Sequence, residues 1–335
     1  MSGAIFLPDP SNSSVIQMRG ERLAGWRKTI LKRIPTRLAL FMGLCVALLQ
    51  GPVGAAASPE RVAHDRIFWL SIAKSHFAVP DGQPIFPLLQ ELTGLLGSPD
   101  SELRDELAYT IIDQWVRHKD VSPTELNSLA DEWRANLRIG IAESGTDTIF
   151  NRSFSALCLA SLAERELKTP FLGPERYQTL LTEAVTYLRE ERDLRGFDPT
   201  KGWIHATAHT ADLLANLASN PMLKVEDQKR LLKAIADRLS SAHLIFSYGE
   251  QDRLSVVAAS LAERKDFDVG AFDQWLADLN TDQKAWKDSP PKQELLQTFE
   301  NDNYMLQALA AHLSAEASPQ IADARNAVLQ MLQRR

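Results

Sequence analysis

Apolar residues recur every three or four positions along most of the chain after residue 57, and no stretch alternates apolar and polar residues for long enough to predict a strand. Helix-start signals, each a capping residue followed by proline, occur at Ser98-Pro99, Ser122-Pro123 and Ser318-Pro319. The pattern predicts about a dozen helices of roughly 12–20 residues. Because the connections are short, neighbouring helices are expected to be antiparallel.

The charged residues are distributed unevenly over these helices. Segments 153–163 and 254–262 carry no charge, and segment 203–220 carries only Asp212. A more charged segment separates each from the next, so buried inner helices are expected to alternate with solvent-facing outer ones. The hexapeptide Ala-Ser-Leu-Ala-Glu-Arg occurs at 160–165 and again at 259–264. The chain is therefore predicted to be all-α, with repeated antiparallel hairpins in one domain over residues 58–335, either a curved HEAT-like solenoid or an α/α toroid.

Residues 1–57 have the features of a leader. A region with seven basic side chains precedes an apolar run from Leu38 to Leu49, and the small residues Gly54 to Ala57 follow. These three parts predict a secretory signal peptide, with Met18 as a candidate start and a periplasmic or secreted mature protein. The run is shorter than the ~20 residues that span a bilayer. The alternative is an uncleaved signal-anchor that holds the protein in the inner membrane.

Removing this leader changes the charge of the chain. The formal net charge is −6, but the leader holds seven of the 37 basic and two of the 43 acidic residues, which leaves 30 and 41 and a net charge of −11. An acidic chain argues against nucleic acid as a partner. Cys158 is the one cysteine after residue 57. An intramolecular disulfide and zinc sites with two or four cysteines are thereby excluded.

Inner helices that alternate with antiparallel outer helices run parallel, so their amino-terminal ends should meet at one rim. Each of the three ends has a glycine, at positions 145, 202 and 249, and unusual polar or aromatic residues cluster there. Free backbone N–H groups at helix starts also suit anions. The candidate site residues are Glu143, Asp147, Arg152, Arg195, Trp203, His205, His209, Asp212 and Tyr248.

The segment from Gly202 to Asp212 is the most distinctive element of this rim. His205, His209 and Asp212 fall on one helical face. They predict one of three arrangements: a site for a divalent metal such as zinc, a metal-free acid/base or substrate-contacting site, or a buried hydrogen-bonded network. The cofactor therefore stays unknown. Ala206, where a zinc protease helix has glutamate, excludes the His-Glu-x-x-His form.

The other candidates have alternatives of their own. Glu143 and Asp147 could act as general acid and base together with the two histidines. Alternatively, Asp147 caps its helix or complements the charge of the helix start, and Arg152 pairs with it. Arg152 and Arg195 could clamp an anionic part of a substrate, and Trp203 and Tyr248 could contact a sugar or another ring. The charged run at 190–193 is expected to be a solvated surface.

Two runs in this region carry a resemblance. The segment from Gly140 to Ser155 and the segment from Leu188 to Asp212 together resemble the signatures of a bacterial family known as domain of unknown function 2785. The resemblance covers roughly residues 100 to 310. It implies grouping and fold, and no activity comes with it.

Two functions of different classes fit these observations. The first is an exported hydrolase or lyase that acts on a polar polymer, glycan or peptide, at the rim. The second is a non-catalytic helical-repeat module that binds a protein or peptide. The sequence leaves open whether the protein is an enzyme.

Overall fold

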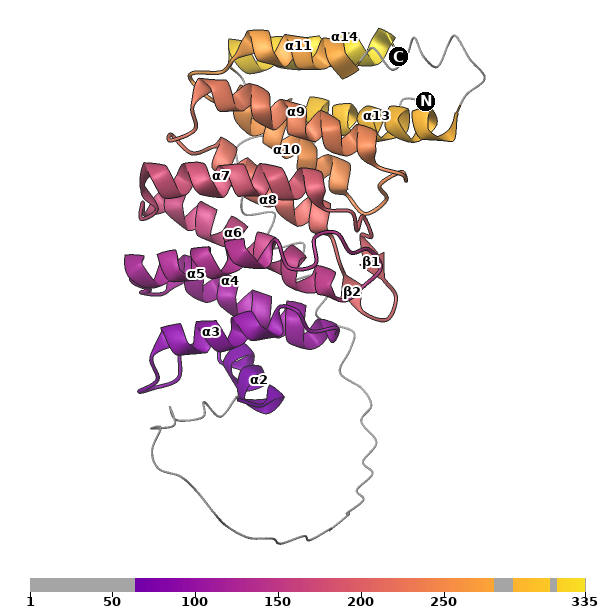
Figure 1. Ribbon diagram of the computed structural model, residues 1–335. Helices are drawn as coiled ribbons and strands as arrows, with labels where there is room; N and C mark the ends of the chain where they lie inside the picture. The colour runs from indigo at the N-terminus through magenta and orange to yellow at the C-terminus, as the bar shows by residue number, and fades with distance from the viewer. Residues whose placement is uncertain (1–63, 280–291, 314–317, 335) are drawn as a thin grey trace, which may run out of the picture. The chain divides into compact units, whose positions relative to one another are not determined.

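The computed structural model describes residues 64–279, 292–313 and 318–334, so the predicted leader at 1–57 lies outside the described residues. The all-α prediction is confirmed, since the described residues form twelve α-helices, one π-helix and a single pair of two-residue strands (Figure 1). The helices are α2 (Arg66–Lys74), α3 (Ile85–Leu95), the π-helix η2 (Glu102–Tyr109), α4 (Thr110–His118), α5 (Pro123–Asn136), α6 (Thr148–Lys168), α7 (Gly173–Glu190), α8 (Ala206–Ala218), α9 (Val225–Ser241), α10 (Glu250–Ala262), α11 (Val269–Leu279), α13 (Gln293–Leu313) and α14 (Pro319–Arg334). The strands are β1 (Phe197–Asp198) and β2 (Gly202–Trp203). Within the described ranges, no helix is both long and apolar enough to span a bilayer.

The predicted helix starts are built from local hydrogen bonds. At α5, the Ser122 hydroxyl accepts from the Glu125 N–H at 3.3 Å, and the Glu125 carboxylate accepts from the Ser122 N–H at 2.9 Å, which makes a capping box. At α14, the Ser318 hydroxyl accepts from the Ile321 N–H at 3.3 Å. Before η2 the acceptor is the Asp100 carboxylate, which receives two backbone N–H groups. Each side-chain oxygen satisfies an N–H that has no partner within its helix.

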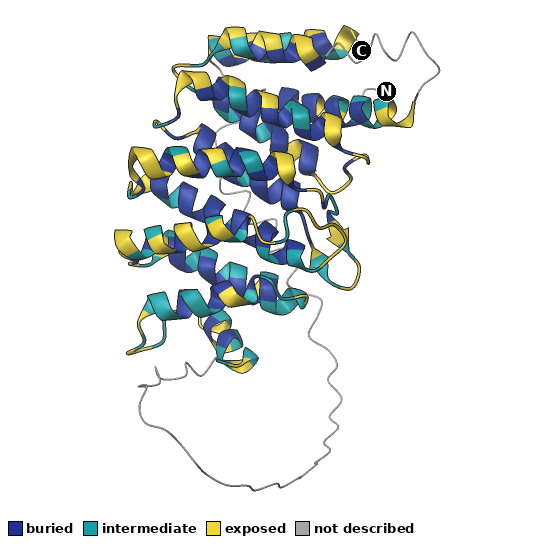
Figure 2. Cartoon of the chain, in the orientation of Figure 1, coloured by how far each residue is buried: buried dark blue, intermediate teal, exposed yellow. Residues whose placement is uncertain are grey.

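The charge-poor segments form a connected inner series. Helix α6 packs against α8, α8 against α10, and α10 against α13, while α4 packs against the other side of α6. In α8, eleven of the thirteen residues are buried, which explains why that helix carries so little charge. The more charged α5 and α7 pack on α6 and α8, and exposed residues line their outer faces (Figure 2). Burial of the charge-poor segments was thus predicted correctly from their composition.

The repeated hexapeptide occupies equivalent places in two inner helices. Arg165, near the end of α6, donates to the Val116 carbonyl at the end of α4 at 2.7 Å. Arg264, just after α10, donates to the Ala218 carbonyl at the end of α8 at 2.8 Å. Both guanidinium groups also bond carbonyls of the loop that follows the capped helix. Each arginine therefore satisfies carbonyls that the preceding inner helix leaves open.

Candidate functional site

A short hairpin interrupts the helices between α7 and α8, next to the amino-terminal ends of the inner helices (Figure 1). Phe197 pairs with Trp203 and Asp198 with Gly202 in antiparallel register. The Asp198 carboxylate closes the turn by accepting from the N–H groups of Thr200 and Lys201. Gly202 has φ of 78°, which glycine adopts without strain. Because each strand has two residues, no alternating pattern in the sequence predicts this hairpin.

Three exposed aromatic side chains meet at the hairpin. The rings of Phe197 and Trp203 lie 5.0 Å apart between centroids, and the Tyr248 ring lies 6.1 and 6.2 Å from them. Their exposed fractions are 39%, 39% and 48%. Contiguous exposed apolar surface of this kind marks interaction sites on soluble proteins. We call Phe197, Trp203 and Tyr248 the aromatic cluster.

Gly196 lets Tyr248 approach the hairpin that carries Phe197 and Trp203. A Cβ atom at this position would lie 2.8 Å from Tyr248 Cγ and 2.6 Å from Glu250 Oε1, closer than side-chain atoms pack. The Gly196 carbonyl also accepts from the N–H groups of Ile204 and His205, at 2.9 and 3.2 Å. Position 196 thus needs glycine because the start of α10 packs directly on its Cα atom.

Arg104 of η2 donates hydrogen bonds to the backbone of the hairpin. This side chain is fully buried, and its Nη2 donates to the carbonyls of Lys201 and Trp203 at 2.6 and 3.1 Å. The guanidinium also lies 4.0 Å from the centroid of the Phe150 ring, a cation–π contact. Burial lowers the pKa of Arg104. No pattern in the sequence singles out this residue, because it lies in an ordinarily charged helix, where nothing distinguishes it from a surface arginine.

His205 links the aromatic cluster to α8. Its backbone is left-handed, with φ of 49°, an unusual conformation for any residue other than glycine. Its ring stacks on Trp203 with centroids 4.5 Å apart, and its Nε2 lies 2.9 Å from the Tyr248 carbonyl oxygen. A carbonyl only accepts, so Nε2 carries the proton and Nδ1 does not. Burial lowers the pKa of His205 to about 4, so the ring is neutral at pH 7.

His209 lies one turn further along α8, with its ring centroid 5.7 Å from that of His205. Its Nδ1 is 2.8 Å from the Ser153 hydroxyl, which itself donates to the Ile204 carbonyl. The hydroxyl proton is therefore engaged, so Nδ1 donates and Nε2 is unprotonated. No partner of Nε2 is found among the described residues. Burial lowers the pKa of His209 well below the usual value, which keeps the ring neutral.

Asp212 does not join the two histidines. It forms an ion pair with Arg253 of α10 instead. In the ranges that the structure describes, no group of three or more His, Cys, Asp or Glu side chains could hold a metal ion. The predicted metal set of His205, His209 and Asp212 is therefore not brought together as such a group.

The two carboxylates predicted as acid and base have other partners. Glu143 is exposed, and its carboxylate accepts from the hydroxyls of Thr146 and Thr148 at 2.8 Å each, which lowers its pKa. Asp147 accepts from the Lys201 ammonium at 2.6 and 2.8 Å. Asp147 occupies the N-cap position of α6, as the alternative expects, but its side chain accepts no hydrogen bond from the first turn of this helix.

Arg152 is buried behind the rim, where it pairs with Glu191 and not with Asp147. Its Nε and Nη2 donate to the two Glu191 oxygens at 2.7 and 3.1 Å, and the side chains are 0% and 3% exposed. The expected pairing with Asp147 is therefore wrong. The expectation that the run at 190–193 is solvated is also wrong for half of it, because Glu191 and Asp193 are buried. With no exposed surface, Arg152 does not face a ligand in this structure.

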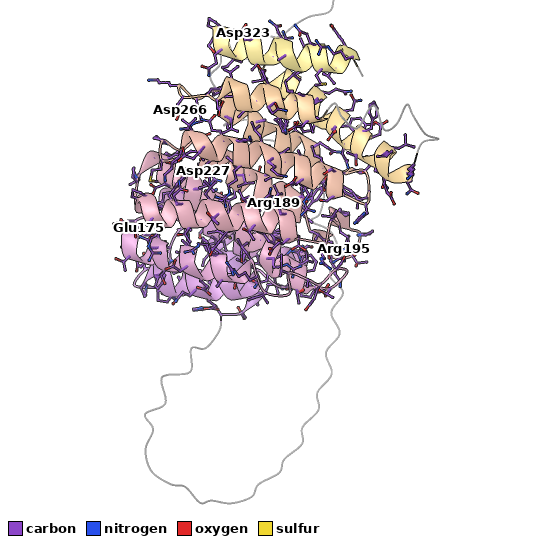
Figure 3. The ribbon with its side chains drawn as sticks, turned by 45° about the horizontal axis from the view of Figure 1, so that its top comes forward. Glu175, Arg189, Arg195, Asp227, Asp266 and Asp323 are labelled. Carbon is purple, nitrogen blue, oxygen red and sulfur yellow. The ribbon has the colours of Figure 1, made fainter. Side chains whose placement is uncertain are left out.

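Arg195 joins two of the predicted rim segments. Its guanidinium pairs with Asp193 at 2.6 and 2.8 Å and donates to the Thr146 carbonyl at 3.0 Å. Burial by itself raises the pKa of Asp193, but hydrogen bonds from Arg195 and from the Gly145 N–H outweigh it and lower the pKa. One third of the Arg195 side chain is exposed, and it lies on the outside of the hairpin region (Figure 3).

The structure therefore divides the predicted residues into two groups. Trp203, His205, His209 and Tyr248 form one site, and Asp147 and Arg195 lie beside it, bonded to Lys201 and to the Thr146 carbonyl. Glu143, Arg152 and Asp212 have separate partners. Phe197, the third aromatic residue, was missed because only its pairing with Trp203 reveals its role.

The site thus belongs to an all-helical protein in which neutral histidines adjoin exposed aromatic rings. Residues 137–311 match the family model described as protein of unknown function (DUF2785), so the chain is a member of this family. The match includes both runs that carry the resemblance seen in the sequence. No curated protein and no solved structure matches the chain.

Proposed function

We propose that this protein binds a segment of a polar polymer, in the first place a glycan, at the aromatic cluster. The observation that carries the proposal is the contact of three exposed rings, Phe197, Trp203 and Tyr248, directly beside His205. Aromatic faces bury the flat apolar face of a sugar ring, while nearby polar groups meet its hydroxyls. At this site the polar groups are the two neutral histidines and Arg195. The peptide alternative needs the same rings to contact side chains.

The scaffold proposed for this site is the repeated-hairpin arrangement, as a curved solenoid or a toroid. Its support is the equivalence of Arg165 and Arg264, which cap the preceding inner helix in the same way two hairpins apart. In such an array each hairpin needs its neighbours to bury its apolar face. The site would then lie on packed helices that hold the rings in place before a ligand arrives, which reduces the entropy lost on binding.

A second candidate function is a hydrolase or lyase with His209 as the general base. The specific observation is its unprotonated Nε2, which has no partner among the described residues. Ser153 fixes this tautomer through its hydrogen bond with Nδ1. Ser153 is not a candidate nucleophile because its hydroxyl is fully buried. If zinc or another divalent ion binds, His205 and His209 would supply two nitrogen ligands and other groups would complete the set.

Localisation is proposed as periplasmic or secreted, on the basis of the leader pattern at 1–57. Mass spectrometry of the protein from fractionated cells measures it directly. A periplasmic or extracellular species that begins near Ser58 supports export with cleavage. An intact chain in the membrane fraction supports the signal-anchor alternative.

Binding is tested by calorimetry with chitohexaose and with cellohexaose. We expect one of them to bind the parent protein and its affinity to fall at least about tenfold in Trp203→Ala, the loss of one stacked ring. The matched control is Tyr304→Ala, which removes a ring on α13 that is 50% exposed and is not one of the three rings of the cluster. Equal affinity of the Trp203→Ala and Tyr304→Ala variants would overturn the proposed site.

Catalysis is tested on the same oligosaccharides by chromatography of the products. Cleavage by the parent protein that is lost in His209→Ala, with binding retained, identifies the enzyme. Binding without cleavage identifies the non-catalytic module. The metal content of the purified protein, compared between the parent and His205→Ala, then shows whether the histidines hold an ion.

A further inference from the structure

A separate pocket of about 220 Å³ lies at the opposite end of α6 from the hairpin. It is lined by Arg117, His118, Lys119, Arg165, Lys168 and Thr169, at the carboxyl-terminal ends of α4 and α6. Helix α6 has 21 residues, so about 30 Å separates this pocket from the rim site. The pocket therefore needs an explanation of its own.

The pocket has more positive than negative charge. Arg117 forms ion pairs with Asp113 and Glu164, and the Lys168 ammonium shares Glu164 at 2.8 Å. No acidic partner of Lys119 is found in the described part of the chain. With Arg165, four cations line the pocket against two paired carboxylates, an excess of two positive charges.

Two other acidic residues nearby do not line the pocket. The Glu166 carboxylate is buried and accepts the backbone N–H groups of Phe171 and Leu172, at 2.5 and 2.9 Å. Asp120 is exposed and does not line the pocket. Among the described residues, the lining of the pocket thus contains basic and polar side chains and no carboxylate.

Helix capping does not account for the lining either. Cations in the last turn of a helix stabilise its dipole, which suits Arg117, Arg165 and Lys168, but the hydrogen bonds that cap α4 come from Arg165. Its counterpart Arg264 performs the same capping at the end of α8, and there Asp266 neutralises it at 2.8 and 3.1 Å. Asp266 lies at the opposite side of the helices from Arg195 (Figure 3). Arg264 caps α8 while it is paired with a carboxylate, so capping by Arg165 does not require the other cations around it.

We propose that this pocket binds an oxyanion of the phosphate class, with Lys119 and Lys168 as its main contacts. Both ammonium groups carry three donors, and the Thr169 hydroxyl and the His118 ring add further polar groups. Cations that converge on one recess recognise phosphate oxygens by charge-assisted hydrogen bonds. The phosphate group belongs either to a small soluble ester or to a lipid head group. The site is independent of the rim and of its proposed ligand.

The test is titration of the purified protein with sodium phosphate by calorimetry, with sodium chloride of equal ionic strength as the reference. We expect phosphate to bind and its affinity to fall at least about tenfold in the K119A/K168A variant, since each lost charge-assisted contact has about that effect. The matched control is Lys265→Ala, an exposed lysine beside Arg264. Circular dichroism melts in chloride verify that all variants are folded.

Two results would overturn the proposal: heats from phosphate that equal those from chloride, or a K119A/K168A variant that binds phosphate like the parent. A second arm separates the two sources of phosphate. Cosedimentation with phosphatidylglycerol vesicles that free phosphate competes away, and that the K119A/K168A variant lacks, identifies a lipid head group. Phosphate binding without cosedimentation identifies a soluble phosphate ester.

Discussion

The buried pair of Arg152 and Glu191 gives the sharpest stability prediction. Glu191→Gln keeps the shape of the side chain and removes its charge, while the Arg152 guanidinium stays buried at 0% exposure. Removing one partner of a buried ion pair costs about 3–5 kcal/mol, because the remaining charge is left uncompensated. Arg152 keeps its hydrogen bonds to the Ile139 carbonyl and the Thr148 hydroxyl, at 2.8 and 3.1 Å. We therefore expect the lower end of that range, about 3 kcal/mol.

The assay is urea unfolding followed by circular dichroism, with the free energy of unfolding extrapolated to water. The matched control is Asp147→Asn, which breaks the ion pair with Lys201, where the side chains are 43% and 37% exposed. Exposed pairs contribute about 0–1 kcal/mol, so this variant should remain close to the parent.

A double variant separates the stranded charge from lost packing. Arg152→Met combined with Glu191→Met removes both charges and keeps apolar volume, and such replacements are often neutral. We expect it to recover most of the stability lost in Glu191→Gln. The reasoning is refuted if Glu191→Gln and Asp147→Asn lose the same free energy, or if the double variant is less stable than Glu191→Gln.

Three further predictions address the site and the scaffold. Burial lowers the pKa of His205 to about 4, against about 6.5 in the unfolded chain, so the unfolded state binds more protons between these values. Lowering the pH from 7 to 5 should thus reduce the free energy of unfolding by ~2 kcal/mol more in the parent than in His205→Gln. Equal losses in the two proteins would contradict the lowered pKa of His205. Gly196→Ala should displace Tyr248, lower the stability by about 1–3 kcal/mol and abolish oligosaccharide binding; a variant that binds like the parent rules out the close approach. Arg165→Ala and Arg264→Ala should each cost about 1–3 kcal/mol in urea unfolding, because each leaves helix-end carbonyls without partners, and a large loss in only one of them would argue against their equivalence.

The sequence by itself determined the helical class and the buried series of helices. Both depend on local properties, the spacing of apolar residues and the scarcity of charge in segments 153–163, 203–220 and 254–262, which hold wherever those segments pack. It also located most of the site, since Trp203, His205 and His209 lie within seven residues of one another. Their proximity follows from this short separation along the chain, although only His209 lies within α8 and the backbone at Trp203 and His205 is not helical.

Only the tertiary structure decided the partners of the charged groups. Arg152 pairs with Glu191, 39 positions away, although Asp147 is the nearer carboxylate in sequence. The choice depends on how α6 and the end of α7 pack, which no local pattern encodes. The same holds for the hairpin, whose two-residue strands are too short to show alternation, and for the tautomers of the histidines. Long-range packing sets these features because each one requires a group from another element to supply the hydrogen bond or the contact.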